Sequence, residues 1–284
     1  MSLFIASLNS GSNGNCYYIG NNNEAVLIDA GISCRETERR MSRLGLSMHK
    51  VKGVFISHEH DDHINGVESL SRKYSLPVYI TDATLRNCRF SVRKELIHHF
   101  CSNERITVGS LTIKAFSKQH DACDPHSFIV QDDEDVCIGI FTDIGKACEQ
   151  VIYHFKQCNA VFLEANYDEN MLAAGRYPWF LKNRISGGQG HLSNNAALEL
   201  FCLYRPKKLS HLILSHLSEN NNTPELVEQL FLQHANETKI VVASRYHETD
   251  VYHIQLASTV KEEKNYSQNA VQLSMFLNNW DDLI

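Results

Sequence analysis

Residues 57–63 read SHEHDDH and directly follow the apolar run VKGVFI, so three histidines and two aspartates occupy seven positions behind a buried-type strand. In an extended backbone, residues i and i+2 point the same way, about 7 Å apart, so His58 and His60 can reach one metal ion. Asp62 and His63 come after the chain begins to turn and can face a second ion. The spacing predicts a metal site at the end of a strand.

Further candidate ligands stand at the ends of other predicted strands, where they are needed because four ligands from one loop cannot complete two sites. His120 follows ITVGSLTIKAFSKQ, Asp143 ends VCIGIFTD and His216 ends HLILSH. Each residue taken alone is more often packed or exposed than a ligand. Their joint placement behind SHEHDDH makes them candidates. Histidine and carboxylate ligands without thiolate suit zinc, manganese or iron.

The order of the predicted elements favours an α/β fold. Short strands separated by the turn sequences SGSNGN and NNN come first, and strands then alternate with helices. Ser33, and Thr223 followed by Pro224, are typical helix starts. Two sheets with helices outside them, an αββα four-layer sandwich, satisfy this order. We expect residues 1–257 to form one domain and residues 258–284 to form a C-terminal tail of unknown structure.

Composition narrows the class of protein. The 284 residues are 43% hydrophobic and 21% charged, which is typical of a soluble globular protein. No apolar run approaches the roughly 20 residues that span a bilayer, so we expect no membrane association. The N-terminus lacks the pattern of a signal peptide. Nine cysteines without a C-x-x-C pair indicate reduced thiols, and the expected location is cytoplasmic.

Charge gives two opposing indications. The net charge of −6 argues against a general polyanion binder, because nucleic-acid binding usually leaves a basic footprint. Two local segments depart from it: RNCRFSVRK (86–94) and RYPWFLKNRISGGQGH (176–191) carry several basic residues and no acid. Each segment is either a solvated face or part of a binding surface.

The motif H-E-H-D-D-H, followed by His120, the TD of Asp143 and the SH of His216, resembles the metallo-β-lactamase superfamily. The resemblance implies an αββα sandwich of metallo-β-lactamase type, with two divalent metal ions at one sandwich edge. It assigns the ligands by position: one ion to His58, His60 and His120, the other to Asp62, His63 and His216, with Asp143 as a bridge. Oxygen-reducing relatives have Glu in place of His60, and antibiotic-hydrolysing relatives have Cys in place of Asp143. All seven ligands are kept, so the site resembles a hydrolytic one.

A narrower resemblance concerns the stretches GSNGNCYYI, HDACDPHSF, EANYDENML, GRYPWFLKNRI, GHLSN and LSHLSENNN. They are similar to the WalJ (YycJ) exonuclease branch, near the ribonuclease Z and phosphonate-pathway phosphodiesterase branches. This implies a phosphodiesterase with zinc or manganese and a metal-bridged hydroxide, more specifically a 5′-to-3′ exonuclease acting on DNA rather than RNA. The alternative is a small-molecule hydrolase for cyclic phosphodiesters, thioesters or lactones, with the same metal site in a narrow pocket. The resemblance assigns no oligomeric state.

Catalytic roles follow for two residues. Asp62 is expected to bind metal and to orient or deprotonate the nucleophile. His191, after the glycine-rich SGGQG, is expected to assist the leaving group; the alternative is a neighbour of the helix cap at Ser193 with no chemical role. Asp29 and Glu164, at predicted strand ends, are expected to orient ligand histidines.

The rest of the predicted site concerns the substrate. Asp61 is expected to face solvent. The basic segment before His191 is expected to bind nucleic acid through phosphate contacts and base stacking. The residues assigned to this role are Arg176, Trp179, Lys182 and Arg184.

Overall fold

The computed structural model describes residues 2–256, with fourteen strands in two sheets of seven. The predicted tail, residues 258–284, lies outside the described residues. The strands of the first sheet, in spatial order, are β14 (Tyr252–Ile254), β1 (Leu3–Asn9), β2 (Cys16–Gly20), β3 (Ala25–Ile28), β4 (Val51–Phe55), β5 (Val78–Ile80) and β6 (Ile97–His99). Those of the second are β13 (Lys239–Val242), β12 (His211–Ser215), β11 (Ala160–Glu164), β10 (Cys137–Phe141), β9 (His126–Gln131), β8 (Leu111–Ser117) and β7 (Arg105–Val108).

Both sheets combine antiparallel and parallel pairing. β1, β2 and β3 form an antiparallel meander, after which β3 to β6 run parallel. In the second sheet β7 to β10 are antiparallel and β10 to β13 parallel. The parallel strands need helical crossovers, which is why helices appear in the sequence only after the first hairpins.

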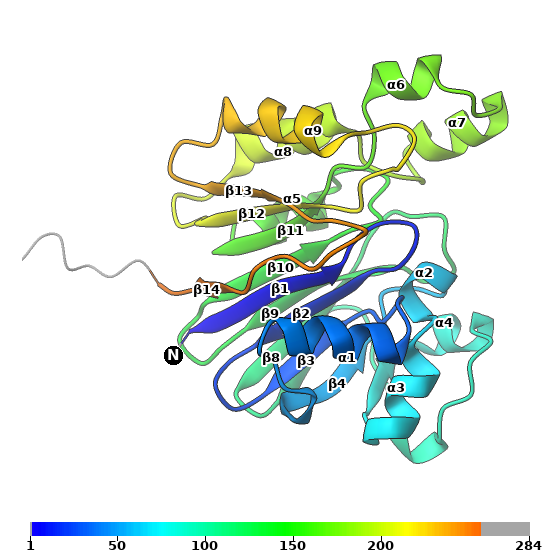
Figure 1. The fold of residues 1–284 in the computed structure, drawn as a ribbon, viewed down its shortest axis with the longest axis vertical. Helices are drawn as coiled ribbons and strands as arrows, with labels where there is room; N and C mark the ends of the chain where they lie inside the picture. Colours follow the sequence, from blue (N-terminus) through cyan, green and yellow to red (C-terminus); the bar gives the residue numbers. More distant parts are fainter. Residues whose placement is uncertain (1, 257–284) are drawn as a thin grey trace, which may run out of the picture.

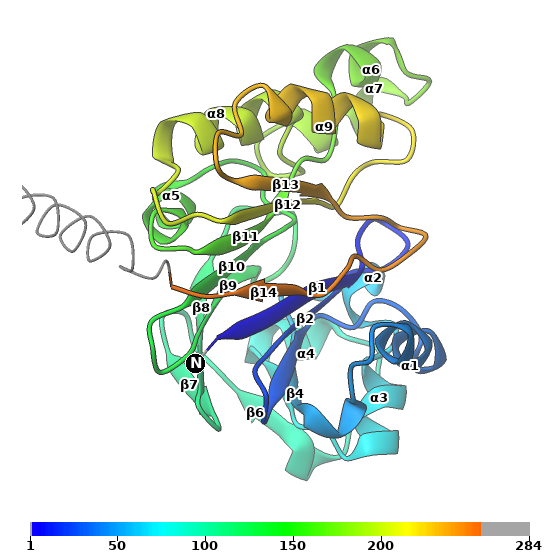
Figure 2. The same ribbon diagram turned by 60° about the vertical axis from the view of Figure 1, so that its left-hand side comes forward.

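Three apolar clusters show that the molecule has four layers. The central cluster lies between the sheets and joins Phe55 of the first sheet to Phe128 and Phe162 of the second. An outer cluster packs α1 (Cys34–Arg43) and α3 (Val67–Tyr74) on the first sheet, and another packs α5 (Glu149–Phe155), α8 (Asn194–Tyr204) and α9 (Pro224–Leu232) on the second. Figures 1 and 2 show these helices on the outer faces. The predicted αββα sandwich is confirmed.

Four further helices of the described chain lie at one edge of the sandwich: α2 (Asp61–Ile64), α4 (Asp82–Asn87), α6 (Glu169–Ala174) and α7 (Trp179–Ser186). The remaining elements are two 3₁₀ turns, η1 (Met48–Lys50) and η2 (Lys94–Leu96). α6 and α7 form an arm that projects from the body, and α4 lies on the other side of α2 (Figures 1 and 2). No helix within residues 2–256 is long and apolar enough to cross a membrane.

Local signals account for several boundaries. Ser33, Ser193 and Thr223 accept backbone N–H groups at the starts of α1, α8 and α9, so the predicted caps are confirmed. One prediction was wrong: ITVGSLTIKAFSKQ is not a single strand. A turn at Gly109 (φ +61°) divides it into β7 and β8, and β8 ends at Ser117, three residues before His120.

The strand ends have an unusual backbone. Asp29, Asp143 and His216 follow β3, β10 and β12, and all three adopt the left-handed conformation, with φ of 60°, 53° and 56°. For residues other than glycine this conformation costs about 1–2 kcal/mol, and such strain clusters at functional sites. The carboxyl ends of the parallel strands therefore turn sharply where the candidate ligands stand.

Candidate metal centre

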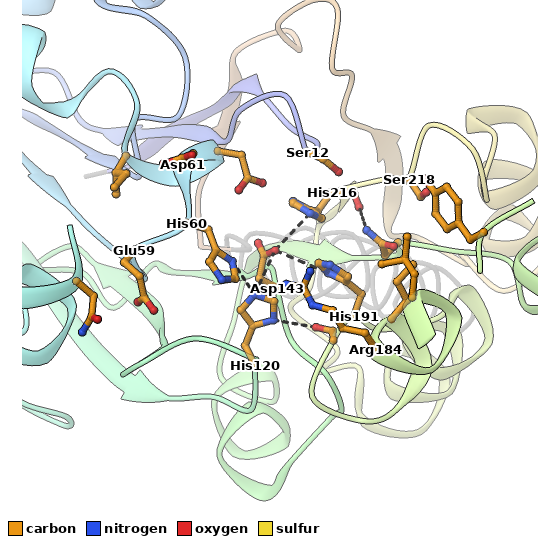
Figure 3. Close-up of a pocket in the computed structure, with 18 of the residues that line it drawn as sticks. Ser12, Glu59, His60, Asp61, His120, Asp143, Arg184, His191, His216 and Ser218 are labelled. Carbon is orange, nitrogen blue, oxygen red and sulfur yellow. Dashed lines mark hydrogen bonds and ion pairs between the residues drawn. The ribbon is translucent and has the colours of Figure 1, made fainter. Parts of the chain in front are cut away.

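The structure brings all seven predicted ligands together at this edge. Two sets of three residues each have potential ligand atoms within 4.8 Å of one another: His58, His60 and His120 in one set, Asp62, His63 and His216 in the other. Asp143 lies between them: its Oδ2 is 3.1 Å from His63 Nε2. Its Oδ1 is 3.3 Å from His216 Nε2 and 3.9 Å from His120 Nε2 (Figure 3). These are the two triads and the bridge that the resemblance implied. Their role as ligands remains a prediction.

In the first triad, one ring nitrogen of each histidine faces the other two, and there are too few protons among these three nitrogens for each to form a hydrogen bond. His120 Nδ1 lies 2.8 Å from Gly190 O, and because a carbonyl only accepts, Nδ1 holds the proton and Nε2 a lone pair. Ser57 Oγ donates to Asp29 and so accepts from His58 Nδ1, which leaves a lone pair on His58 Nε2 as well. Both Nε2 atoms face His60 Nδ1, at 3.1 and 3.4 Å. One proton there satisfies only one of them, whereas a cation satisfies all three nitrogens.

The second triad repeats the arrangement. His63 Nδ1 donates to Asp29 Oδ2 at 2.7 Å, and His216 Nδ1 donates to Asn15 Oδ1 at 3.0 Å. In the neutral rings, Nε2 then carries a lone pair on the side of the Asp143 carboxylate, and His63 Nε2 also lies 3.1 Å from Asn15 Nδ2. The buried Asp143 Oδ2 has no hydrogen bond of good geometry from any described residue. A lone pair that faces a carboxylate needs a proton or a metal cation between them, and the donor set fits divalent metal ions. Asp29 holds His63 in the way its predicted orienting role requires.

Burial and charge oppose each other across the cluster. Burial lowers the pKa of His120 and of His216 to about 3 each. Burial also acts to lower the pKa of His63, but the carboxylates of Asp143, Asp29 and Asp62 outweigh it and hold that pKa well above its usual value. For Asp143 burial raises the pKa, but the surrounding histidines outweigh it and keep the residue ionised. Such a concentration of buried carboxylate charge is suited to bound cations.

His191 is held by Glu164, which was predicted to orient a ligand histidine; the histidine that it contacts is not one of the seven predicted ligands. Its Nδ1 lies 2.7 Å from Glu164 Oε1, while Glu164 Oε2 accepts the Ile144 N–H at 2.6 Å. Burial acts to lower the pKa of His191, but the Glu164 carboxylate outweighs it and raises the pKa to about 9. With Nδ1 occupied, Nε2 is the ring nitrogen left for a substrate. Glu164 and His191 also lie within reach of Asp143 and His216 as a third possible ligand set.

The centre forms the floor of a cavity of about 560 Å³, and the cavity contains one of the four predicted substrate-binding residues. That residue, Arg184, lines the wall formed by α7, where its Nε forms an ion pair with Asp121. Lys182 Nζ donates to Ala173 O at 2.6 Å, and Trp179 is 77% exposed on the arm. Arg176 is exposed outside the cavity lining.

Sequence reasoning placed Asp61 correctly but missed two buried residues. Asp61 is exposed, as predicted. Asn15, fully buried, accepts from His216 and from the Tyr17 hydroxyl, and its Nδ2 lies 3.2 Å from Asp62 Oδ2. Lys118, buried beneath the centre, donates to Thr142 O at 2.8 Å. Two features of the sequence could have indicated these residues: the polar turn SGSNGN for Asn15, and the position two residues before His120 for Lys118.

Comparison with known proteins agrees with the fold. The model of the "Beta-lactamase superfamily domain" matches residues 24–216, and the chain belongs to this superfamily of metal-dependent hydrolases. Within it, the chain is 32% identical to "Exodeoxyribonuclease YycJ" of Bacillus anthracis over 260 residues, covering 88% of this chain and 96% of that protein.

One further relative and one solved structure are also similar to the chain. "Exodeoxyribonuclease WalJ" of Streptococcus pneumoniae serotype 2 is 31% identical over 224 residues, which cover 77% of this chain and 83% of that protein. Among solved structures, the metallo-β-lactamase fold protein YhfI of Bacillus subtilis superposes with a TM-score of 0.68 at 14% identity, covering 89% of this chain and all of that one. At that identity the structural likeness concerns the fold alone.

Proposed function

We propose that this protein is a phosphodiesterase with two divalent metal ions, zinc or manganese, that removes nucleotides from the 5′ ends of DNA. The observation that carries the proposal is the pair of triads around Asp143, at the floor of a cavity that His191 also lines. The similarity to two proteins named exodeoxyribonucleases supports DNA as the substrate. The divalent ions, when bound, supply Lewis-acid stabilisation of phosphoryl charge and lower the pKa of water.

Asp62 is the residue we assign to the nucleophile. Its carboxylate is partly exposed to the cavity, and the contact from Asn15 Nδ2 to its Oδ2 fixes its orientation. A carboxylate in this position can accept the proton of the attacking water while it also holds an ion. The neighbouring Asp61, exposed at the start of α2, has no such support.

His191 is the residue we assign to the leaving group. Glu164 fixes its Nδ1 and stabilises the protonated ring, so Nε2 can donate a proton. As the phosphorus bonds to the attacking oxygen, its bond to the 3′ oxygen of the terminal nucleotide breaks, and that oxygen takes the proton. In a 5′-to-3′ reaction the terminal nucleotide is therefore released on the His191 side, and the phosphate stays with the rest of the strand.

The α6–α7 arm is assigned to the substrate next to His191. Trp179 and Phe180, 77% and 70% exposed, offer surfaces on which bases can stack. Arg176 and Lys182 add positive charge to the arm. A substrate phosphate must compete with Asp121 for Arg184, so this arginine can bind the substrate only when its ion pair with Asp121 opens.

The test is digestion of linear DNA labelled at the 5′ or the 3′ end, with added Mn²⁺ or Zn²⁺. We expect stepwise loss from the 5′ end by the intact protein, no cleavage by Asp62→Ala and strongly reduced cleavage by His191→Ala. Asp133→Asn, a surface change in the turn between β9 and β10, is the control and should match the intact protein. Turnover of a small phosphodiester or thioester, with neither DNA nor RNA cleaved, would contradict the proposal and indicate a small-molecule hydrolase.

A further inference from the structure

The basic segment 86–94, which the proposed function does not use, forms the wall of the cavity opposite α7. Asn87 and Arg89 line the cavity together with the metal-centre residues. The segment includes the end of α4, and the two ribbon views agree that α4 and α7 lie on opposite sides of α2. We call residues 86–94 the α4 rim.

The α4 rim presents its basic side chains in a regular way. Between residues 88 and 93, burial alternates with every residue. Cys88, Phe90 and Val92 pack inward against the apolar cluster outside the first sheet. Arg89 and Arg93 point outward, as do Arg86 at the end of α4 and Lys94 at the start of η2. In an extended segment, outward side chains recur about every 7 Å; Ser91 takes the outward position between Arg89 and Arg93, so these two arginines stand about 14 Å apart and can contact separate phosphates of one strand.

The α4 rim is also fixed relative to the metal centre. Asn87 Nδ2 donates to Cys123 Sγ at 3.2 Å, and Cys123 N–H donates to Glu59 Oε1 at 2.7 Å. Cys123 follows His120 by three residues, and Glu59 lies between His58 and His60. Arg89 therefore stands on a segment connected to both parts of the first triad, which keeps it in place before a substrate arrives.

The two walls differ in the partners of their arginines. Arg184 on the α7 wall is already paired with Asp121. On the α4 rim Arg93 lies 3.5 Å from Glu95, but Arg86, Arg89 and Lys94 pair with no carboxylate among residues 2–256. Unpaired, exposed guanidinium groups beside a phosphodiester-cleaving centre are suited to bind phosphate.

We propose that the α4 rim binds the phosphates of the strand that remains after cleavage, while the terminal nucleotide leaves on the His191 side. This inference rests on the proposed nuclease function and deepens it, because it assigns the polymer to one wall. It predicts that the contribution of the rim to kcat/KM increases with the number of nucleotides on the 3′ side of the cleaved bond. A dinucleotide has no further phosphate behind the cleaved bond, so on this assignment it offers the rim no phosphate to bind.

The test compares Arg86→Gln/Arg89→Gln with the matched control Lys207→Gln/Lys208→Gln, which removes the same charge from an exposed turn at the amino-terminal end of β12. The substrates are a dinucleotide and single-stranded DNA of increasing length. We expect the rim variant to lose kcat/KM progressively with length and to keep it on the dinucleotide. The slope of log kcat/KM against log salt on long DNA should become less negative by about 1.4, because each lost phosphate contact removes about 0.7 from its magnitude on a single strand. The control variant should match the intact protein.

Two other results have distinct meanings. Suppose that the intact protein degrades DNA and that the rim variant keeps the length and salt dependence of the control, or loses as much kcat/KM on the dinucleotide as on long DNA. In either case the proposed role of the rim is wrong, and the nuclease function stands. If the intact protein cleaves no nucleic acid, both proposals fail. Binding of the same DNA series in EDTA, with equal Tm values for the two double variants, separates a lost contact from a folding defect.

Discussion

The floor of the cavity and its walls are built differently. On the floor, His58, His63, His120 and His216 each have one ring nitrogen held by a partner and the other turned toward the centre. On the walls, Arg89 has no carboxylate partner within the described chain, and Arg184 has one, the half-buried Asp121. The floor geometry is thus set by folding, while the wall side chains are free to respond to a substrate. This contrast places the chemistry in the floor and the choice of substrate in the walls.

The largest effect is expected from Asp143→Asn, which removes the charge that lies between the two triads. We expect loss of bound metal and a decrease in activity of about 10³-fold or more. Elemental analysis of the purified protein, with Asp133→Asn as the control, checks the metal content. Full metal content in Asp143→Asn would show that metal binding at the floor does not depend on this carboxylate.

His191→Ala distinguishes a floor ligand from a catalytic group at the cavity surface. As a proton donor, His191 contributes about 10²–10⁴-fold to kcat, and its removal should leave the metal content unchanged. Its place in a third possible ligand set makes the opposite result informative. A loss of metal in this variant would assign His191 to the metal centre instead.

Asp29→Asn tests whether the outer hydrogen bonds hold the floor together. Asparagine tolerates the left-handed backbone at this position, so the fold should be kept. The amide can no longer accept from all of its present donors, among them His63 Nδ1 and Ser57. We expect metal affinity to fall about 10–100-fold, measured by competition with a chelator. An unchanged affinity would leave Asp29 with a purely structural role.

Asp121→Asn tests the walls. It should release Arg184 for phosphate and make the α7 wall resemble the α4 rim. We expect KM for long DNA to fall a few-fold and the salt slope to steepen by about 0.7, since one phosphate contact is gained. A higher KM with an unchanged slope would show that the ion pair serves to position α7.

The smallest effect concerns a carboxylate at the other end of β3 from Asp29. Hydrogen bonds from the side chain and backbone of Ser110 lower the pKa of Glu24. Because the folded pKa lies below the unfolded one, this stabilisation is present above the unfolded pKa of about 4.3 and is lost as pH falls through the folded pKa. Glu24→Gln should therefore lower the free energy of unfolding by about 1 kcal/mol at neutral pH and less in acid, measured by urea denaturation. An equal loss of unfolding free energy at neutral pH and in acid would contradict this explanation.

The sequence predicted the sandwich because strands are readable from local pattern, and the resemblance to a known superfamily assigned the seven candidate ligands to two triads and a bridge. His120, three residues past the end of β8, shows that a strand-end pattern alone does not place every one of them. Asn15 and Lys118 were missed because an asparagine in a turn and a lysine near a strand end are ordinary residues until the fold buries them. The left-handed backbone of Asp143 and His216 has no signature in side-chain type. The segment 86–94 was visible as a basic stretch, but its position at the cavity depends on contacts between segments distant in sequence, such as Asn87 with Cys123.

The most direct test of the metal centre is anomalous diffraction from crystals of the intact protein grown with Mn²⁺ or Zn²⁺. We expect two anomalous peaks, one bound by His58, His60 and His120 and the other by Asp62, His63 and His216, with Asp143 in contact with both. A single peak, or a second peak held by Glu164 and His191, would contradict this expectation.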